Sequence, residues 1–318
     1  MINKLKTSFK YIKQSKFREL IFRGRLLTEY YYGTLKYNLI NKINRDKFKT
    51  ITINGSKMCI HLGDNGISKE LYLYKQHEKF ATEFMKSFLN EDDIIIEIGA
   101  NIGYYVLLEN KKLKNGEIFA CEPGSFIRKL LEINIKLNNI DNVKIYPFAL
   151  GDQNKEQDFY IHDKINWSSF KNNIGKIVST EAVQTMTIDS FVKEYLGDRC
   201  PTVLRMDVEG YEYNVIKGAM DTISRCDRLK IFMEIHPYIL SPEELSELIQ
   251  IFKSNNFEIK AIINEIPEPH YYPFLNNKMW NSIEDVPFGF IGSGYECLMK
   301  SLQKGRGTEV FLEKSKNR

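Results

Sequence analysis

The sequence predicts an α/β fold built on a doubly wound, mostly parallel sheet of seven strands, with an N-terminal helical arm ahead of it. From residue 92 onward, short apolar runs alternate with segments in which apolar residues recur every three or four positions. The short runs are typical of buried strands, and the recurring pattern is typical of helices. Regular alternation of the two favours a sheet covered by helices on both faces.

Charge divides the chain into two regions. Of the 318 residues, 43% are hydrophobic, which is the composition of a folded globular protein. Residues 1–50 carry a balance of +10, which leaves −6 for the remainder, since the whole chain is +4. We therefore divide the chain into a basic, aromatic-rich helical arm at 1–50 and one α/β domain at 51–318. The arm is either a helical cap on the domain or an amphipathic contact with anionic membrane.

The elements follow in order. A hairpin is expected over 50–67 with the turn Asn54-Gly55, and then a helix capped by Ser68. The expected strands of the main sheet are 93–98, 117–121, 143–150, 203–206, 229–235 and 257–263, with a seventh at 288–291 or 297–299. Helical spacing marks 104–108, 126–137, 188–195, 215–223 and 245–252. Two insertions, near 151–186 and 264–287, interrupt this order and are candidate binding loops.

Cysteine usage and hydropathy give an expected location. Five scattered cysteines without a C-x-x-C pair predict neither a disulfide scaffold nor a zinc site, and favour a reducing compartment. The sequence has no uncharged apolar stretch of the roughly 18–20 residues that a spanning helix needs. Residues 1–10 lack the apolar core of a secretory signal. We expect a cytoplasmic protein, with residues 1–50 as its candidate contact with the inner face of the membrane.

The end of the first main-sheet strand carries the strongest ligand-binding signal. It reads Glu97-Ile98-Gly99-Ala100-Asn101-Ile102-Gly103. Gly99 permits a sharp turn, and Gly103 permits a close approach of the next helix. Glu122 ends the second strand, 23 residues after Gly99. That is near the spacing at which a carboxylate binds the ribose hydroxyls of an adenosine-type cofactor.

Charge at this edge distinguishes between cofactors. A dinucleotide site usually reads G-x-G-x-x-G, whereas here Asn101 stands between Gly99 and Gly103. Glu97 lies two positions before the first glycine, where its carboxylate would repel a pyrophosphate. It would suit the cationic ammonium and sulfonium groups of S-adenosylmethionine. The sequence therefore favours S-adenosylmethionine over a nicotinamide dinucleotide.

Six ordered motifs resemble those of the FkbM-type methyltransferase family. They are Glu97-Ile98-Gly99-Ala100-Asn101-Ile102-Gly103-Tyr104-Tyr105, Cys121-Glu122-Pro123, Ala149-Leu150-Gly151-Asp152, Thr187-Ile188-Asp189-Ser190-Phe191, Arg205-Met206-Asp207-Val208-Glu209-Gly210-Tyr211-Glu212 and Glu234-Ile235-His236-Pro237. The resemblance covers about residues 70–240. Two departures keep the charge: Arg205 replaces the family's usual Lys, and Glu97 replaces its commoner Asp.

The resemblance implies a Rossmann-like fold that binds S-adenosylmethionine across the ends of the first two strands. The cofactor-binding residues that it implies are Glu78, Glu97, Gly99, Asn101, Gly103, Glu122, Ala149, Leu150 and Asp152. Glu122 would hold the ribose diol, while Ala149, Leu150 and Asp152 would border the adenine. Glu78 either faces the same pocket or is a surface residue of the preceding helix.

Acidic and basic groups are expected to meet where the reactive methyl group would lie, at the ends of the fourth and fifth strands. Asp207 and Glu209 follow the fourth strand, and His236 follows the fifth, which also carries Glu234. An acceptor hydroxyl must lose a proton, and a histidine titrates near neutral pH. Asp207, Glu209 and His236 are therefore the candidate catalytic residues. Helix capping by Asp207 and a structural histidine are the alternatives, and no metal site is predicted because no ligand spacing demands one.

The function expected from these features is S-adenosylmethionine-dependent O-methylation. The acceptor would be a hydroxyl or carboxyl of a sugar, a glycan or a lipid-linked glycan precursor. The alternatives are a nucleotide-dependent oxidoreductase or epimerase, a methyltransferase acting on RNA, and a fold that only binds. Nucleic acid is disfavoured because residues 51–318 are acidic overall. The oligomeric state is left open.

Overall fold

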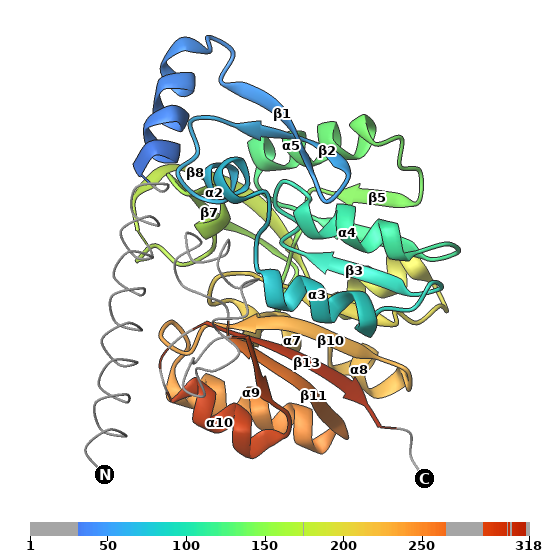
Figure 1. The fold of residues 1–318 in the computed structure, drawn as a ribbon. Coiled ribbons are helices and arrows are strands. Elements are labelled where there is room, and N and C mark those ends of the chain that lie inside the picture. Colours follow the sequence, from blue (N-terminus) through green and yellow to red (C-terminus); the bar gives the residue numbers. More distant parts are fainter. Residues whose placement is uncertain (1–30, 174, 265–288, 304, 306, 316–318) are drawn as a thin grey trace, which may run out of the picture.

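The fold centres on one eight-stranded sheet (Figure 1). The computed structural model describes residues 31–173, 175–264, 289–303, 305 and 307–315. Across the sheet the strands run β5 (Val143–Tyr146), β4 (Glu117–Cys121), β3 (Ile94–Ile98), β9 (Val203–Met206), β10 (Lys230–Ile235), β13 (Thr308–Lys314), β11 (Phe257–Asn264) and β12 (Gly289–Gly292). This order places β3 beside both β4 and β9, which makes the carboxyl end of β3 the point where the chain reverses its direction across the sheet. Ligands bind at such points in open α/β sheets.

The sheet is mostly parallel, as the sequence predicts. Strands β5, β4, β3, β9 and β10 pair in parallel, whereas β13 lies antiparallel between β10 and β11. The predicted seventh strand near 288–291 is β12, an edge strand, and β13, which was not predicted, brings the total to eight. The alternative at 297–299 is wrong, because those residues lie in the helix α10 (Tyr295–Leu302). Strand β13 was missed because acids flank its short apolar run of Val310, Phe311 and Leu312.

Two hydrophobic cores cover the two faces of the sheet. Successive residues of β3 point to opposite faces of the sheet, so Ile95 joins one core and Ile96 the other. The first core is closed by α4 (Tyr104–Lys112), α5 (Ser125–Leu137) and the hairpin of β1 (Phe48–Ile53) and β2 (Ser56–His61). The second is closed by α6 (Ile188–Phe191), α7 (Glu212–Lys217), α8 (Met220–Arg225), α9 (Pro242–Ser254) and α10. Burial on both faces explains the continuous apolar runs of the central strands.

The segment between the hairpin and β3 holds two helices where the sequence predicts one. These are α2 (Ile67–Tyr74) and α3 (Lys79–Phe88). The helix is interrupted between them because Lys75 and Glu78 adopt left-handed conformations. Ser68 lies inside α2 and is not its cap. The carboxylate of Asp64 accepts hydrogen bonds from the backbone N–H groups of Gly66 (2.8 Å) and Ser68 (2.7 Å) instead.

The first insertion folds as a small sheet of its own. The predicted third strand, 143–150, ends at Tyr146, and the next strand, β6 (Ala149–Leu150), joins β8 (Ile177–Met186) and β7 (Lys155–His162) in a three-stranded sheet. The second insertion, 264–287, lies outside the described residues except for Asn264. Of the arm, residues 31–43 are helical and residues 1–30 lie outside the described part.

Two of the five cysteines form a disulfide, which corrects the expectation of reduced thiols. Cys200, just before β9, bonds to Cys226, just after α8, with their Cα atoms 5.7 Å apart. They lie 26 residues apart and come together because β9 and β10, the strands that they precede, pair in parallel, so their spacing carries no recognisable pattern. Within the described ranges, no helix has the length and apolar character required to cross a membrane.

Candidate functional site

A pocket of about 760 Å³, counted out to its open mouth, lies at the carboxyl ends of the central strands. Its floor is the turn from Ile98 to Asn101, between β3 and α4. Glu122 borders it at the end of β4, and Asp207 borders it after β9. The pocket therefore occupies the edge of the sheet at which the sequence predicts cofactor binding.

The β3–α4 turn is shaped by glycine. Gly99 has φ +77°, and a Cβ atom there would lie 2.6 Å from the carbonyl oxygen of Asp207. Only glycine lets the ends of β3 and β9 approach so closely without strain. The N–H groups of Gly99 and Ala100 both donate to the carbonyl of Cys121 (3.0 Å each), which ties this turn to the end of β4.

Glu122 is fixed at the pocket wall by backbone donors. Its two carboxylate oxygens accept hydrogen bonds from the N–H groups of Asn101 (2.9 Å) and Gly124 (2.8 Å). Each oxygen keeps a further lone pair that can accept a hydroxyl. The residue is 4% exposed, and burial raises the pKa of Glu122 to about 7 in spite of these donors.

One part of the pocket lining comes from the first insertion and from the strand that precedes it. Ala149 and Leu150 line the pocket, as predicted, whereas Asp152 is not among its lining residues. Phe170 packs against Tyr211 with ring centroids 4.6 Å apart and the ring planes tilted by 48°, and both residues line the pocket. Phe170 was not predicted to line the pocket, because the sequence of an insertion does not indicate which way its side chains face, whereas Tyr211 belongs to a family motif but was given no role.

Glu97 and Gly103 are placed differently from their predicted roles. Neither is among the lining residues. Glu97 is fully buried and accepts a hydrogen bond from Arg205 (2.9 Å). Gly103 faces α5, where a Cβ atom would lie 2.6 Å from Leu131. Their contacts are thus with the protein core rather than with the pocket.

Arg205 is the centre of a buried ionic network at the pocket, which Arg205 and Tyr105 both line. Besides Glu97, it lies 3.9 Å from carboxylate oxygens of both Glu78 and Asp207, and its guanidinium stacks 3.8 Å from the ring centroid of Tyr105. Tyr105 donates a hydrogen bond to Glu78 (2.5 Å). Glu78 therefore contacts the network that supports the pocket instead of lining the pocket itself.

Glu97 and Glu109 form a pair of facing acids in this network. Burial raises the pKa of Glu97 well above its usual range and raises that of Glu109 to about 7, while Arg205 opposes both shifts. The nearby Glu109 adds to the rise at Glu97, because two acids close together in a buried site disfavour a second negative charge. Glu109 was missed because nothing in the helical pattern of α4 marks it as buried.

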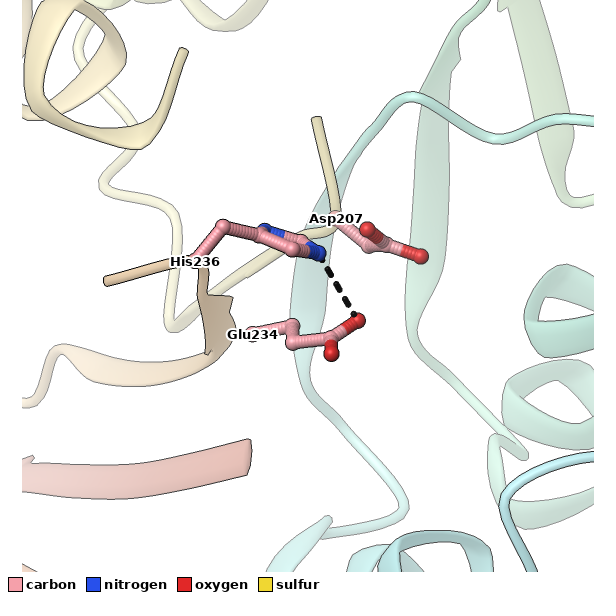
Figure 2. Close-up of side chains that lie close together, drawn as sticks. All are labelled: Asp207, Glu234 and His236. Atoms are coloured by element: carbon pink, nitrogen blue, oxygen red, sulfur yellow. Dashed lines mark ion pairs between the residues drawn. The ribbon is translucent and has the colours of Figure 1, made fainter. Parts of the chain in front are cut away.

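The three predicted catalytic residues do come together. His236 Nε2 lies 3.4 Å from Glu209 Oε2, and its Nδ1 lies 2.6 Å from Glu212 Oε1. Glu234 Oε2 is also 3.4 Å from Nε2, and Figure 2 shows Glu234 turned toward the imidazole with Asp207 beside them. Among these, Asp207 is the one that lines the pocket.

Burial acts in opposite directions on the acids and the histidine, but the pKa of Asp207 and that of His236 are both raised. Burial and the nearby Glu234 raise the pKa of Asp207 to about 7. Burial alone would lower the pKa of His236, but Glu234, Glu209 and Glu212 outweigh it and raise that pKa well above its usual value. In this state His236 is the protonated partner of a group of acids, and Asp207 is the group able to exchange a proton with the pocket.

Comparison with known proteins identifies the family. Residues 97–259, slightly more than half of the chain, match the model of the methyltransferase FkbM domain. The chain belongs to the FkbM methyltransferase family. The matched region contains the β3–α4 turn, Glu122 and the whole acid–histidine cluster.

Individual relatives are more distant. The chain is 27% identical over 149 residues to Methyltransferase 1 of Beauveria bassiana, covering 41% of this chain and 60% of that protein. It is 34% identical over 84 residues to the tRNA (guanine(37)-N(1))-methyltransferase Trm5b of Pyrococcus abyssi, a quarter of each chain. The solved FkbM methyltransferase of Methylobacillus flagellatus is similar with a TM-score of 0.43 at 17% identity, over 63% of this chain and 50% of that one. The chain thus spans less than two thirds of these two sequence relatives.

Proposed function

We propose that this FkbM-family protein is an S-adenosylmethionine-dependent O-methyltransferase. The observation that carries the proposal is Glu122, a buried carboxylate held by two backbone N–H groups at the wall of the pocket. A carboxylate fixed in this way suits the vicinal hydroxyls of a ribose.

The pocket fits an adenosine-type methyl donor on both sides of Glu122. The Gly99 turn leaves the floor free of side chains, and Ala149 with Leu150 supplies an apolar surface for an adenine. S-adenosylmethionine, when bound, supplies an electrophilic methyl group for displacement by a nucleophile of the acceptor. The chain's own residues would bind the ribose, orient the two reactants and exclude water.

Asp207 is the group we propose to take the acceptor's proton. It borders the pocket and has a pKa of about 7, raised by burial, which suits a general base acting near neutral pH. His236 and Glu209 lie behind it and would act by setting its charge and position. This arrangement favours an acceptor hydroxyl or carboxyl, and we propose a sugar, a glycan or a lipid-linked glycan precursor as its carrier.

An RNA acceptor is the second candidate. It is favoured by the 34% identity to a tRNA methyltransferase over 84 residues and by the +10 balance of residues 1–50. The acidic balance of residues 51–318 opposes it, because a phosphate backbone is bound by cationic surfaces. Contact of residues 1–50 with anionic membrane and a cytoplasmic location stay predictions.

Calorimetric titration of the full chain tests the donor, with S-adenosylhomocysteine and NADH titrated side by side. Micromolar binding of the first and none of the second is the expected result. The reverse would support an oxidoreductase or epimerase instead. Transfer of a radiolabelled methyl group to a glycan fraction, compared with transfer to total tRNA, then separates the two acceptor classes.

A further inference from the structure

A buried acid and a half-buried acid face each other across neighbouring strands of the main sheet. Glu234 of β10 and Glu309 of β13 are direct partners in the antiparallel register and lie on the same face. Glu309 is 2% exposed, and neither of its carboxylate oxygens has a hydrogen-bond partner within the described ranges. Like charges directly opposite each other destabilise a sheet, and a buried carboxylate without a partner is costly. A cation bound between or beside Glu234 and Glu309 would therefore stabilise the pair.

Metal-ligating atoms gather around Glu234. Single ligand atoms of Asp207, Glu234 and His236 all lie within 4.8 Å of one another (Figure 2), as do those of Glu78, Glu234 and Glu309. A divalent ion holds its ligands at about 2.0–2.2 Å, which allows opposite ligands to be up to roughly 4.4 Å apart. Small side-chain rotations that move these atoms by a few tenths of an ångström would let Asp207, Glu234 and His236 bind one ion.

His236 is oriented as metal-binding histidines are. Its Nδ1 faces Glu212 Oε1 at 2.6 Å, and Glu212 is itself fully buried. Its Nε2 is turned toward Glu234. A histidine that binds a metal through one ring nitrogen usually donates the other N–H to a carboxylate, which fixes the ring.

The positive side chains among the described residues do not balance the negative charge of this cluster. Arg205 approaches Asp207 only to 3.9 Å and makes its short contact, 2.9 Å, with Glu97. Besides Arg205, the positive group within contact range is the imidazolium of His236 itself, which faces Glu209, Glu212 and Glu234. One added divalent ion would offset the excess negative charge.

We infer that this cluster is a binding site for one divalent cation of the Mn²⁺ type. Asp207, Glu234 and His236 are the ligands, and Glu309 is the buried negative charge behind Glu234 that the ion neutralises. A set of two carboxylates and one imidazole suits Mn²⁺ better than Ca²⁺, because Ca²⁺ sites typically use oxygen ligands alone. Because Asp207 also lines the pocket, the ion would lower the pKa of an acceptor hydroxyl there, and Asp207 would then act as a ligand of the ion rather than as the proton acceptor. That role rests on the proposed function, whereas the binding itself does not.

Titration of the full chain with MnCl₂ tests the site, with free Mn²⁺ followed by electron paramagnetic resonance. We expect one saturable ion per chain. Glu234→Gln and Glu309→Gln should each weaken binding at least about tenfold, because each removes one negative charge of the cluster. Glu313→Gln is the matched control: it lies on the same strand, is 44% exposed and pairs with Lys260, so Mn²⁺ binding should match that of the wild type.

Absence of saturable binding at millimolar Mn²⁺, or equal affinity of the wild type and both cluster variants, would overturn the inference. If circular dichroism shows that Glu309→Gln does not fold, Asp207→Asn replaces it with the same expected loss, since that side chain is 18% exposed. Calorimetry with S-adenosylhomocysteine on the same sample separates the two claims. Donor binding without Mn²⁺ binding contradicts the metal site alone, and Mn²⁺ binding without donor binding contradicts the proposed function alone.

Discussion

Replacement of Arg205 by methionine tests the buried ionic network around Arg205. The substitution keeps an apolar stem of similar length but removes a cation that lies 2.9 Å from Glu97 and 3.9 Å from Glu78 and Asp207. The side chain of Arg205 is 4% exposed and that of Glu97 fully buried, so solvent screens their interaction little. Removing one partner of such a buried pair costs about 3–5 kcal/mol. We expect that loss in the free energy of unfolding of Arg205→Met.

The loss should grow with pH, because Arg205 lowers the pKa of Glu109 and that of Asp207, each about 7 in the wild type, and its removal would raise both. Without the cation, the folded protein holds protons on its acids that the unfolded chain releases above a pH of about 4.3. Stability then falls as pH rises toward the folded pKa, by at most about 1.4 kcal/mol per pH unit for each such acid. The variant should therefore be further below wild type at pH 8 than at pH 6.

Urea denaturation at the two pH values is the assay. The matched control is Arg199→Met, because Arg199 pairs with Glu117 while 46% exposed, and such surface pairs contribute about 0–1 kcal/mol. Adding Glu97→Gln to Arg205→Met should recover part of the loss, since it removes the stranded charge. A loss below about 1 kcal/mol at pH 8, or one equal to that of the Arg199 control, would refute the reasoning.

Two further predictions concern the turn and the histidine. Gly99→Ala should destabilise the fold by about 2–4 kcal/mol in urea denaturation, because a Cβ at φ +77° meets the Asp207 carbonyl at 2.6 Å. Gly305→Ala, with φ +66° and nothing within 4 Å, should cost about 1–2 kcal/mol, and an equal cost for both would contradict the steric argument. Glu212→Gln should lower the pKa of His236, measured by NMR titration of its ring, because one of the carboxylates that raise it becomes neutral. An unchanged pKa would show that the 2.6 Å contact does not set the charge of this histidine.

Local sequence signals predicted the parts of the site that depend on one turn of chain. The turn at Gly99, and Glu122 at the end of the next strand, could be placed because spacing along a β–α–β unit fixes both. Glu97 was assigned to the pocket although strand alternation puts it on the face of Ile95, within the first core. The prediction used the charge of Glu97 and did not consider which face of the strand its side chain occupies.

The parts that were missed depend on contacts distant in sequence. Glu309 meets Glu234 because β13 inserts antiparallel beside β10, a pairing that no local pattern announces. Phe170 reaches the pocket only because the first insertion folds into its own sheet over the strand ends. The Cys200–Cys226 bond likewise depends on the parallel pairing of β9 with β10. Tertiary packing supplied what local propensity could not.

The central claim is that Glu122 holds the ribose of a methyl donor. The measurement that tests it most directly is the dissociation constant of S-adenosylhomocysteine for the wild type and for Glu122→Gln, with folding of the variant checked by circular dichroism. Hydrogen bonds to a charged group contribute about 1.5–3 kcal/mol, so we expect affinity to fall roughly 10- to 100-fold. Glu181→Gln, which changes a neighbouring acid that binds Ser125 instead, should leave affinity close to that of the wild type. Unchanged affinity in a folded Glu122→Gln protein would contradict the account.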